Sequence, residues 1–185
     1  MYFWKTCRPT LRLLRLIVGT IILAGQAGCV TTRHLDSTRA QAPKFDAVAF
    51  FENRTEGKGV LKIVGRRSEP TLVEGLGRVT IDHAIDLYQS VKRGNRLATH
   101  RQWHLRPDGA GGYIGTLTDA VGPVLGTVDG NRLHIVFMLK GRLKADQWLY
   151  LDKGGMIAHN IMIIRKLGMP VARLDETITR ISPQQ

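Results

Sequence analysis

Residues 131–139 read NRLHIVFML, and their alternating pattern decides the fold class. The odd-numbered positions share one side and are all apolar: Leu133, Ile135, Phe137 and Leu139. His134, Val136 and Met138 occupy the other side. A period of two is typical of a β-strand, whose successive side chains point to opposite faces. We therefore predict a strand that is largely apolar on both faces.

Similar short runs follow one another from Phe45 onward, separated by residues that favour turns. The turn signals are Gly57-Lys58-Gly59, Arg93-Gly94-Asn95, Asp108-Gly109, Asp129-Gly130-Asn131 and Asp152-Lys153-Gly154. Gly, Asn and Asp tolerate the positive φ that tight turns require. About nine strands in such a meander predict an antiparallel sheet, either a sandwich or a barrel. Closure into a barrel would remove the exposed edges, so we expect an all-β, antiparallel up-and-down β-barrel.

Residues 45–53, FDAVAFFEN, break the alternation. Phe45, Val48, Ala49 and Glu52 fall at helical spacing, which predicts one short helix before the first strand. If the strands that follow are apolar on both faces, the barrel has either an apolar outer face or an apolar interior. A barrel of about eight strands can just hold one small ligand, and this is the basis of a functional prediction.

The first 28 residues have the layout of a secretory signal peptide. A cationic segment without acidic residues precedes an apolar run at 16–24, and small residues follow; the cations are Lys5, Arg8, Arg12 and Arg15. The apolar run is about ten residues long, shorter than the roughly 20 that a helix needs to span a bilayer. An uncleaved membrane anchor over residues 11–28 is the alternative.

Cys29 ends this segment in a context that resembles the processing site of bacterial lipoproteins. Ala27 and Gly28 match that site, whereas Gln26 departs from it, since the pattern wants Leu or a similar apolar residue there. The resemblance implies that Cys29 is lipid-modified. Val30, in place of the aspartate of inner-membrane retention, favours an outer-membrane address facing the periplasm. An ordinary signal-peptidase cut after Ala27 remains the competing interpretation.

The domain division follows from this start. We predict a signal peptide over 1–28, a polar tether over 29–44 and one barrel domain over 45–185. Cys7 lies in the segment that would be removed, so the mature chain would keep Cys29 alone and have no internal disulfide. A multi-chain acyl anchor would hold such a protein on a membrane rather than across it.

The chain is strongly basic, with a formal net charge of +12. Removing the four signal-peptide cations leaves 23 − 15 = +8. The cations are scattered and form no run of five, so a solvated basic surface is the simplest interpretation. For an exported protein, anionic lipid headgroups are more plausible neighbours than nucleic acid, and we predict no nucleic-acid binding.

Several longer motifs together carry a family resemblance. They are Trp103-x-Leu105, Asp108-Gly109…Tyr113-x-Gly115, Asp119-x-x-Gly122, Gly126, Gly130-Asn131, Asp146-x-Trp148-x-Tyr150-Leu151, Asn160 and Lys166-x-Gly168. On these residues the chain resembles a family of bacterial lipoproteins of unknown function, DUF3833, over about residues 45–181. The resemblance implies a lipocalin-like (calycin) barrel at the cell envelope, but no activity, substrate or catalytic residue. Ala120 and Pro123 depart from the family's pattern without affecting the predicted fold.

Six residues are predicted to bind a ligand: Trp103, Asp146, Trp148, Tyr150, Asn160 and Lys166. Trp148 and Tyr150 share a strand face with Asp146, whereas Leu149 and Leu151 point the other way. Aromatic walls with a few fixed polar groups are typical of ligand pockets. The alternative is structural, with the aromatic rings closing one barrel end and the acid satisfying a buried partner.

The sequence contains no recognisable catalytic or metal motif. His100 and His104 would lie about 13 Å apart on a strand, too far for one metal ion. The serines stand in no nucleophile elbow, and no phosphate-binding or dinucleotide-binding loop is present. We expect no enzymatic activity, no cofactor and no metal.

The leading hypothesis is therefore a lipid-anchored envelope protein that binds or carries a small apolar ligand, such as a fatty acid or lipid. The alternative is a non-catalytic structural or interaction module whose barrel is filled by side chains. A hydrolase acting on envelope lipid or glycan is a weaker third possibility, because no pair of titratable groups can be named for it.

Overall fold

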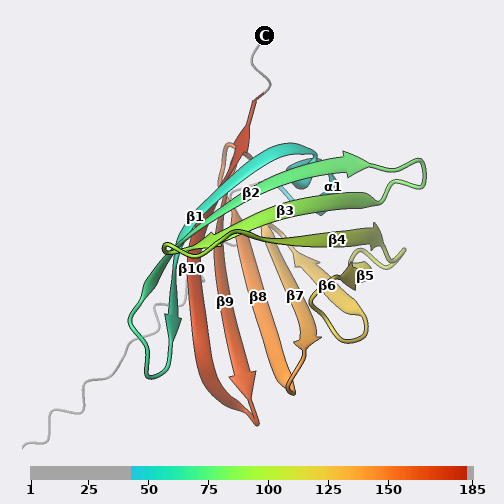
Figure 1. The fold of residues 1–185 in the computed structure, drawn as a ribbon. Helices are drawn as coiled ribbons and strands as arrows, with labels where there is room; N and C mark the ends of the chain where they lie inside the picture. The colour runs from blue at the N-terminus through green and yellow to red at the C-terminus, as the bar shows by residue number, and fades with distance from the viewer. Residues whose placement is uncertain (1–42, 183–185) are drawn as a thin grey trace, which may run out of the picture. The chain divides into compact units, whose positions relative to one another are not determined.

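The computed structural model describes residues 43–182 of the chain (Figure 1). Its elements are α1 (Ala47–Phe51), β1 (Asn53–Ile63), β2 (Glu69–Val79), β3 (Ile85–Arg93), β4 (Thr99–Pro107), β5 (Tyr113–Leu117), β6 (Val124–Asp129), β7 (Arg132–Leu139), β8 (Leu143–Leu151), β9 (Ile157–Lys166) and β10 (Met169–Ile181). The predicted signal peptide, Cys29 and most of the predicted tether lie outside the described residues. The predicted domain boundaries therefore stay predictions.

The strands form a closed up-and-down barrel. Each strand pairs antiparallel with its neighbours in sequence, and β10 pairs with β1 to close the sheet. That closing pair runs from Arg54 opposite Ile181 to Ile63 opposite Ala172, so the seam is a full ladder without a free edge. The predicted fold class is confirmed, with ten strands in place of about nine.

One predicted turn is wrong. Gly57 and Gly59 lie in the middle of β1, not in a turn. A Cβ atom at Gly57 would collide with the carboxyl group of Glu176, and one at Gly59 with the backbone carbonyl of Asp175. These glycines therefore allow a close approach of β10, a second common reason for glycine in a strand. The other four turn signals do connect successive strands.

The alternation of β7 and β8 sorts their side chains as predicted. Leu133, Ile135 and Phe137 of β7 point into the barrel, together with Ala145 and Leu149 of β8. The aliphatic face of β8 is thus the inner face. These residues form one continuous hydrophobic core with the buried residues of β3, β4 and the segment around α1.

The barrel has two different ends. The end formed by the β2–β3, β4–β5, β6–β7 and β8–β9 turns is called the helix end. The opposite end, formed by the β1–β2, β3–β4, β5–β6, β7–β8 and β9–β10 turns, is called the open end. In Figure 1 the β7–β8 and β9–β10 turns lie at the bottom, and α1 lies near the upper right.

The short predicted helix is confirmed as α1, and it closes the helix end. Phe45, Phe50 and Phe51 are buried, and the Phe50 ring centroid lies 5.4 Å from that of Phe45 and 5.0 Å from that of Phe51. The Tyr113 hydroxyl accepts a hydrogen bond from the Ala47 amide at 3.0 Å and holds the helix in place. Within residues 43–182, no helix has the length and apolar character needed to cross a membrane.

Candidate functional site

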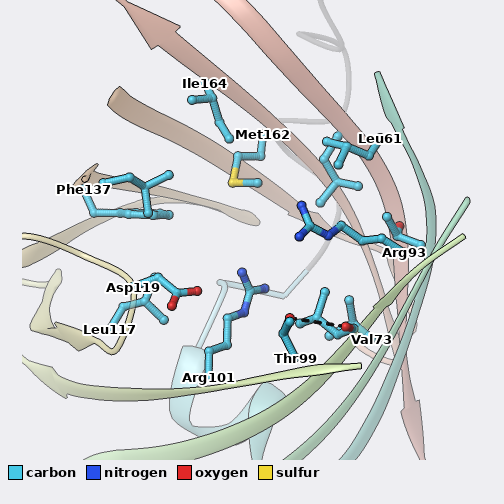
Figure 2. A pocket seen from close by; sticks show the side chains of 14 residues that line it. Leu61, Val73, Arg93, Thr99, Arg101, Leu117, Asp119, Phe137, Met162 and Ile164 are labelled. Carbon is cyan, nitrogen blue, oxygen red and sulfur yellow. Dashed lines mark hydrogen bonds between the residues drawn. The ribbon is translucent and has the colours of Figure 1, made fainter. Parts of the chain in front are cut away.

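A cavity of about 190 Å³ lies inside the barrel at the open end (Figure 2). Its lining comes from the parts of the strands nearest the open-end turns. Most of the wall is apolar and includes Leu61, Val73, Phe137, Met162, Ile164 and Leu174. Three charged residues also line it: Arg93, Arg101 and Asp119. Because Thr99 and Asp119 are exposed, the cavity communicates with solvent at this end.

The pairing of β3 with β4 brings the two arginines to the cavity. Arg93 ends β3 on the same face as Gln89, because positions two and four apart in a strand share a face. Arg101 lies opposite Gln89 in the ladder and two residues before Trp103. Both guanidinium groups point into the cavity in Figure 2, with the Asp119 carboxylate beside Arg101.

Arg101 is held rigidly at its base. Its Nε donates a hydrogen bond to Gln89 Oε1 at 2.7 Å, and Trp103 Nε1 donates to the same oxygen at 2.9 Å. The guanidinium carbon lies 5.6 Å from the centroid of the Trp103 ring, within range of a cation–π interaction. The terminal nitrogens are thereby directed into the cavity.

Burial of Arg101 disfavours the charged form of its guanidinium group. Loss of solvent lowers the pKa of its guanidinium, while Glu176 and Asp119 raise it at longer range and Arg93 lowers it further. An arginine stays cationic under such conditions. Within the part of the chain that the structure describes, neither Arg93 nor Arg101 forms an ion pair with a carboxylate. Two positive charges and one negative charge therefore line an otherwise mostly apolar cavity, and its excess positive charge is an arrangement that an anionic group would stabilise.

A smaller gap of about 20 Å³, lined by both polar and apolar side chains, lies next to Arg101 and has room for about one water molecule. Glu176 lines this gap, is only 8% exposed, and accepts a hydrogen bond from Asn160 Nδ2 at 2.8 Å. Its other carboxyl oxygen has no partner among residues 43–182. Burial raises the pKa of Glu176, although the Asn160 hydrogen bond and the charge of Arg101 oppose the rise.

Two of the predicted ligand-binding residues lie inside the barrel. Trp103 lines the smaller gap beside Arg101, and Asn160 is bonded to Glu176. Lys166 ends β9 at the open end and is exposed. Cys29, the predicted lipidation site, lies outside the described residues.

The other three predicted ligand-binding residues lie on the outer face of β8. Asp146, Trp148 and Tyr150 alternate with the inward residues Ala145 and Leu149, so they point away from the cavity. A ligand role for them stays a prediction, and the cavity does not depend on them.

The carboxylate of Asp146, on the outer face of β8, has two cationic partners. It accepts from Arg165 Nη1 at 2.7 Å and lies 3.2 Å from Lys144 Nζ. The ring of His134 stacks on Trp148 with centroids 4.8 Å apart. Burial lowers the pKa of His134, although Asp146 opposes the shift. In this cluster Asp146 pairs with partly exposed cations, and the rings of Trp148 and Tyr150 lie on the outer face of β8 rather than closing a barrel end.

The sequence analysis missed Arg93, Arg101, Gln89 and Glu176. It grouped Arg93 with a solvated basic surface, and it did not single out Arg101. One signal was available: Arg101 stands two residues before Trp103, so both must share a strand face. Because Trp103 is buried inside the barrel, Arg101 lies on the inner face as well.

Comparisons with known proteins agree with this architecture. The S-type phycobiliprotein lyase CPES from Guillardia theta has a similar structure, with a TM-score of 0.60 and 8% identity over 74% of this chain and 92% of that chain. A protein of unknown function from the DUF3598 family of Nostoc punctiforme PCC 73102 gives a TM-score of 0.55 and 13% identity, over 76% of this chain and 51% of that chain. At such identities the similarity establishes the lipocalin-like, or calycin-like, barrel fold alone.

At the level of sequence, no curated protein matches the chain. A family model described as "Protein of unknown function (DUF3833)" matches residues 23–180.

Proposed function

This chain belongs to the DUF3833 family, and because that family has no known function, we propose one from the geometry of the barrel: binding of a small amphipathic anion. The ligand class is a fatty acid or a similar lipid. Its acyl chain lies against the apolar wall formed by residues such as Phe137 and Met162. Its anionic head pairs with Arg93 and Arg101.

One observation carries the proposal: two guanidinium groups point into a mostly apolar cavity that holds one carboxylate, Asp119, and neither guanidinium forms an ion pair among the described residues. Guanidinium groups bind carboxylates through paired, charge-assisted hydrogen bonds. An apolar wall with a few convergent polar groups is the usual composition of a small-molecule site. The modest volume favours a ligand of medium chain length, or one whose chain extends past the open end.

The alternative of a completely filled barrel applies to one half of the molecule. Around α1 the interior is packed with Phe45, Phe50, Leu133 and Leu149, each no more than 2% exposed. The cavity at the open end supports binding over a purely structural role. The proposal contains no catalytic step, because binding needs only the wall and the two charges.

We also propose that the protein is lipid-anchored through Cys29 at the outer membrane, facing the periplasm. This part rests on the sequence of residues 1–29. It would keep the barrel beside a source of amphipathic ligands. Mass spectrometry of the mature protein should find diacylglycerol and acyl additions on Cys29 and none in Cys29→Ser. An unmodified N-terminus beginning at Gly28 would contradict it.

Titration calorimetry with decanoate and decanol tests the ligand class. The two probes share an acyl chain and differ in charge, so decanoate should bind about tenfold more tightly than decanol. Arg93→Gln and Arg101→Gln should each reduce that preference. Arg106→Gln, an exposed position on the same strand as Arg101, is the matched control and should bind like the wild type.

A second variant tests the location of the chain. Met162→Trp places a larger side chain in the cavity and should weaken decanoate binding without changing the charges. Circular dichroism and the unfolding midpoint of each variant establish that it has folded. Failure of decanoate to bind, or equal binding by Arg93→Gln, Arg101→Gln and wild type, would refute the proposal.

A further inference from the structure

Several of the open-end turns carry exposed apolar side chains. Val64, Leu97, Val121 and Leu167 occupy four different open-end turns, and Met169 begins β10 beside the last of them. Leu97 is 92% exposed and Leu167 is 78% exposed. A single exposed apolar residue is ordinary, but a ring of them around one end indicates an interaction site. We refer to the five open-end turns, residues 64–68, 94–98, 118–123, 140–142 and 167–168, as the open rim.

The open rim is also strongly basic. It contains five cations and one carboxylate, Asp119; the cations are Arg66, Arg67, Arg96, Lys140 and Arg142. Arg96 pairs with Glu69 at 2.8 Å, at the start of β2. The turns of the helix end have the opposite balance, with three carboxylates, Asp82, Asp108 and Asp152, against Lys153. The turns at the two ends of the barrel therefore carry net charges of opposite sign.

The cavity lies at the same end. Its lining residues Arg93 and Thr99 directly flank the β3–β4 turn, and Leu139 directly precedes the β7–β8 turn. A surface that covered the open rim would therefore cover the cavity mouth, while the helix end, closed by α1, would face away.

We propose that the open rim docks onto an anionic lipid bilayer. The apolar tips enter the headgroup region, where such side chains are favoured, and the cations lie against the anionic headgroups. The acidic helix end is repelled by the same surface, so the barrel has one preferred orientation. The proposal concerns the outer surface of the rim and goes beyond ligand binding in the cavity.

A bilayer fits this rim better than a protein partner does. The apolar side chains come from separate turns around a cavity mouth and form no continuous apolar face. In a bilayer, each apolar side chain can insert into the headgroup region by itself, whereas a protein interface needs a contiguous, well-packed centre. The excess of cations on the same turns selects an anionic surface.

The orientation can be tested in the full chain with tryptophan probes. Leu97→Trp places the probe on the open rim, and Ile81→Trp places it on the helix end, at a residue that is 102% exposed against 92% for Leu97. Each variant is mixed with vesicles of phosphatidylcholine and phosphatidylglycerol whose acyl chains are brominated. Quenching above the wild-type background should occur for Leu97→Trp and not for Ile81→Trp. Because both proteins carry the same N-terminal segment, any difference reports the orientation of the barrel.

The charge requirement is tested in the Leu97→Trp background. The added changes Arg66→Glu and Arg142→Glu should lower the apparent affinity of the rim for these vesicles by about tenfold or more. Lys153→Glu at the helix end is the control and should leave the quenching unchanged. Vesicles of phosphatidylcholine alone should quench Leu97→Trp only weakly.

Equal quenching at positions 97 and 81, or quenching that is insensitive to the rim charges, would overturn the docking proposal. Neither result bears on ligand binding, since the decanoate titration uses no membrane. Conversely, loss of decanoate binding would leave the docking result intact.

Discussion

At the scale of single residues, Glu176 is the most informative side chain in the barrel. Its carboxyl group is buried against Gly57, bonded on one oxygen to Asn160, and unpartnered on the other within the described residues. Burial raises its pKa above the ordinary value of 4.5. The folded state therefore holds a proton that the unfolded state has already lost, over the pH interval between the two pKa values.

The sign of the resulting pH dependence follows from that interval. Stability falls as the pH rises from about 4.5 through the raised pKa of Glu176. Glu176→Gln cannot ionise, so its free energy of unfolding relative to wild type should increase across the same interval. Urea unfolding at a series of pH values measures that difference.

The control for this experiment is Glu74→Gln, an exposed residue on the outer face of β2. It removes an exposed carboxyl group, so a pH trend seen only with Glu176→Gln is due to the buried carboxyl group. Asp175, whose pKa is lowered by its hydrogen bonds with Arg173, gives stability that is lost only as the pH falls below about 3.8. That contribution is the same in wild type and in both variants, so it cancels in the differences of unfolding free energy. A flat difference for Glu176→Gln would contradict the proposed protonation.

At the scale of elements, α1 closes the barrel and is held there by packing and by hydrogen bonds to the side chain of Tyr113. The Tyr113 hydroxyl accepts from the Ala47 amide and donates to Asp46 Oδ1 at 3.2 Å. Asp46 Oδ1 also caps the helix by accepting from the Val48 amide at 2.9 Å. A five-residue helix is too short to be stable alone, so its position depends on these contacts and on the packing of its phenylalanines.

Tyr113→Phe tests this attachment. The substitution keeps the ring but leaves the buried Ala47 amide without its acceptor, which should cost about 1–3 kcal/mol of unfolding free energy. Tyr88→Phe, at an exposed position on β3, is the matched control and should cost little. Denaturant unfolding measures both. Equal stability of the two variants would mean that the helix is held by packing alone.

At the scale of the whole molecule, the barrel combines a packed half and a hollow half. Leu149 of β8 and Ala158 of β9 are fully buried near α1, whereas Leu143 and Ile164 of the same strands are only half-buried near the cavity. The same sheet thus encloses a packed core at one end and surrounds a cavity at the other.

This asymmetry predicts a gradient of hydrogen exchange along single strands. Amides of β8 and β9 near residues 149 and 158 should exchange more slowly than those near 143 and 164, because local opening needs less free energy where fewer apolar contacts are lost. Decanoate should slow exchange mainly at the hollow end. Exchange measured by NMR or mass spectrometry decides the matter, and uniform protection along β8 and β9 would count against a hollow half.

Local sequence signals were sufficient for most of the architecture. Alternation in residues 131–139 and 143–151 predicted the strands and their two faces, because the side-chain direction in a strand depends only on position parity. Four of five turn signals were correct for a similarly local reason, the tolerance of Gly, Asn and Asp for positive φ. The error at Gly57 and Gly59 arose because a glycine in a turn and a glycine beneath a neighbouring strand look the same in one sequence.

The candidate site could not be derived in this way. Trp103 and Asn160 do lie inside the barrel, whereas Trp148 and Tyr150 lie on the outer face of β8, and a ligand role for all four stays a prediction. Both faces of that strand carry bulky side chains, so the pattern gives two faces without saying which one is inside. Closure of the barrel makes that choice, and it also brings Arg101 of β4 close to Glu176 and Asn160, which face each other on the neighbouring strands β10 and β9.

Two kinds of information therefore separate cleanly in this protein. Short-range chemistry along the chain specified strands, turns, one small helix and membership of a family. Contacts between residues far apart in sequence decide the remaining features. These are the direction in which the sheet curves, the barrel end that α1 closes, and the position of Arg93 and Arg101 at the cavity. Such contacts exist only once the sheet has closed, and for that reason the cavity and its charges first become visible in three dimensions.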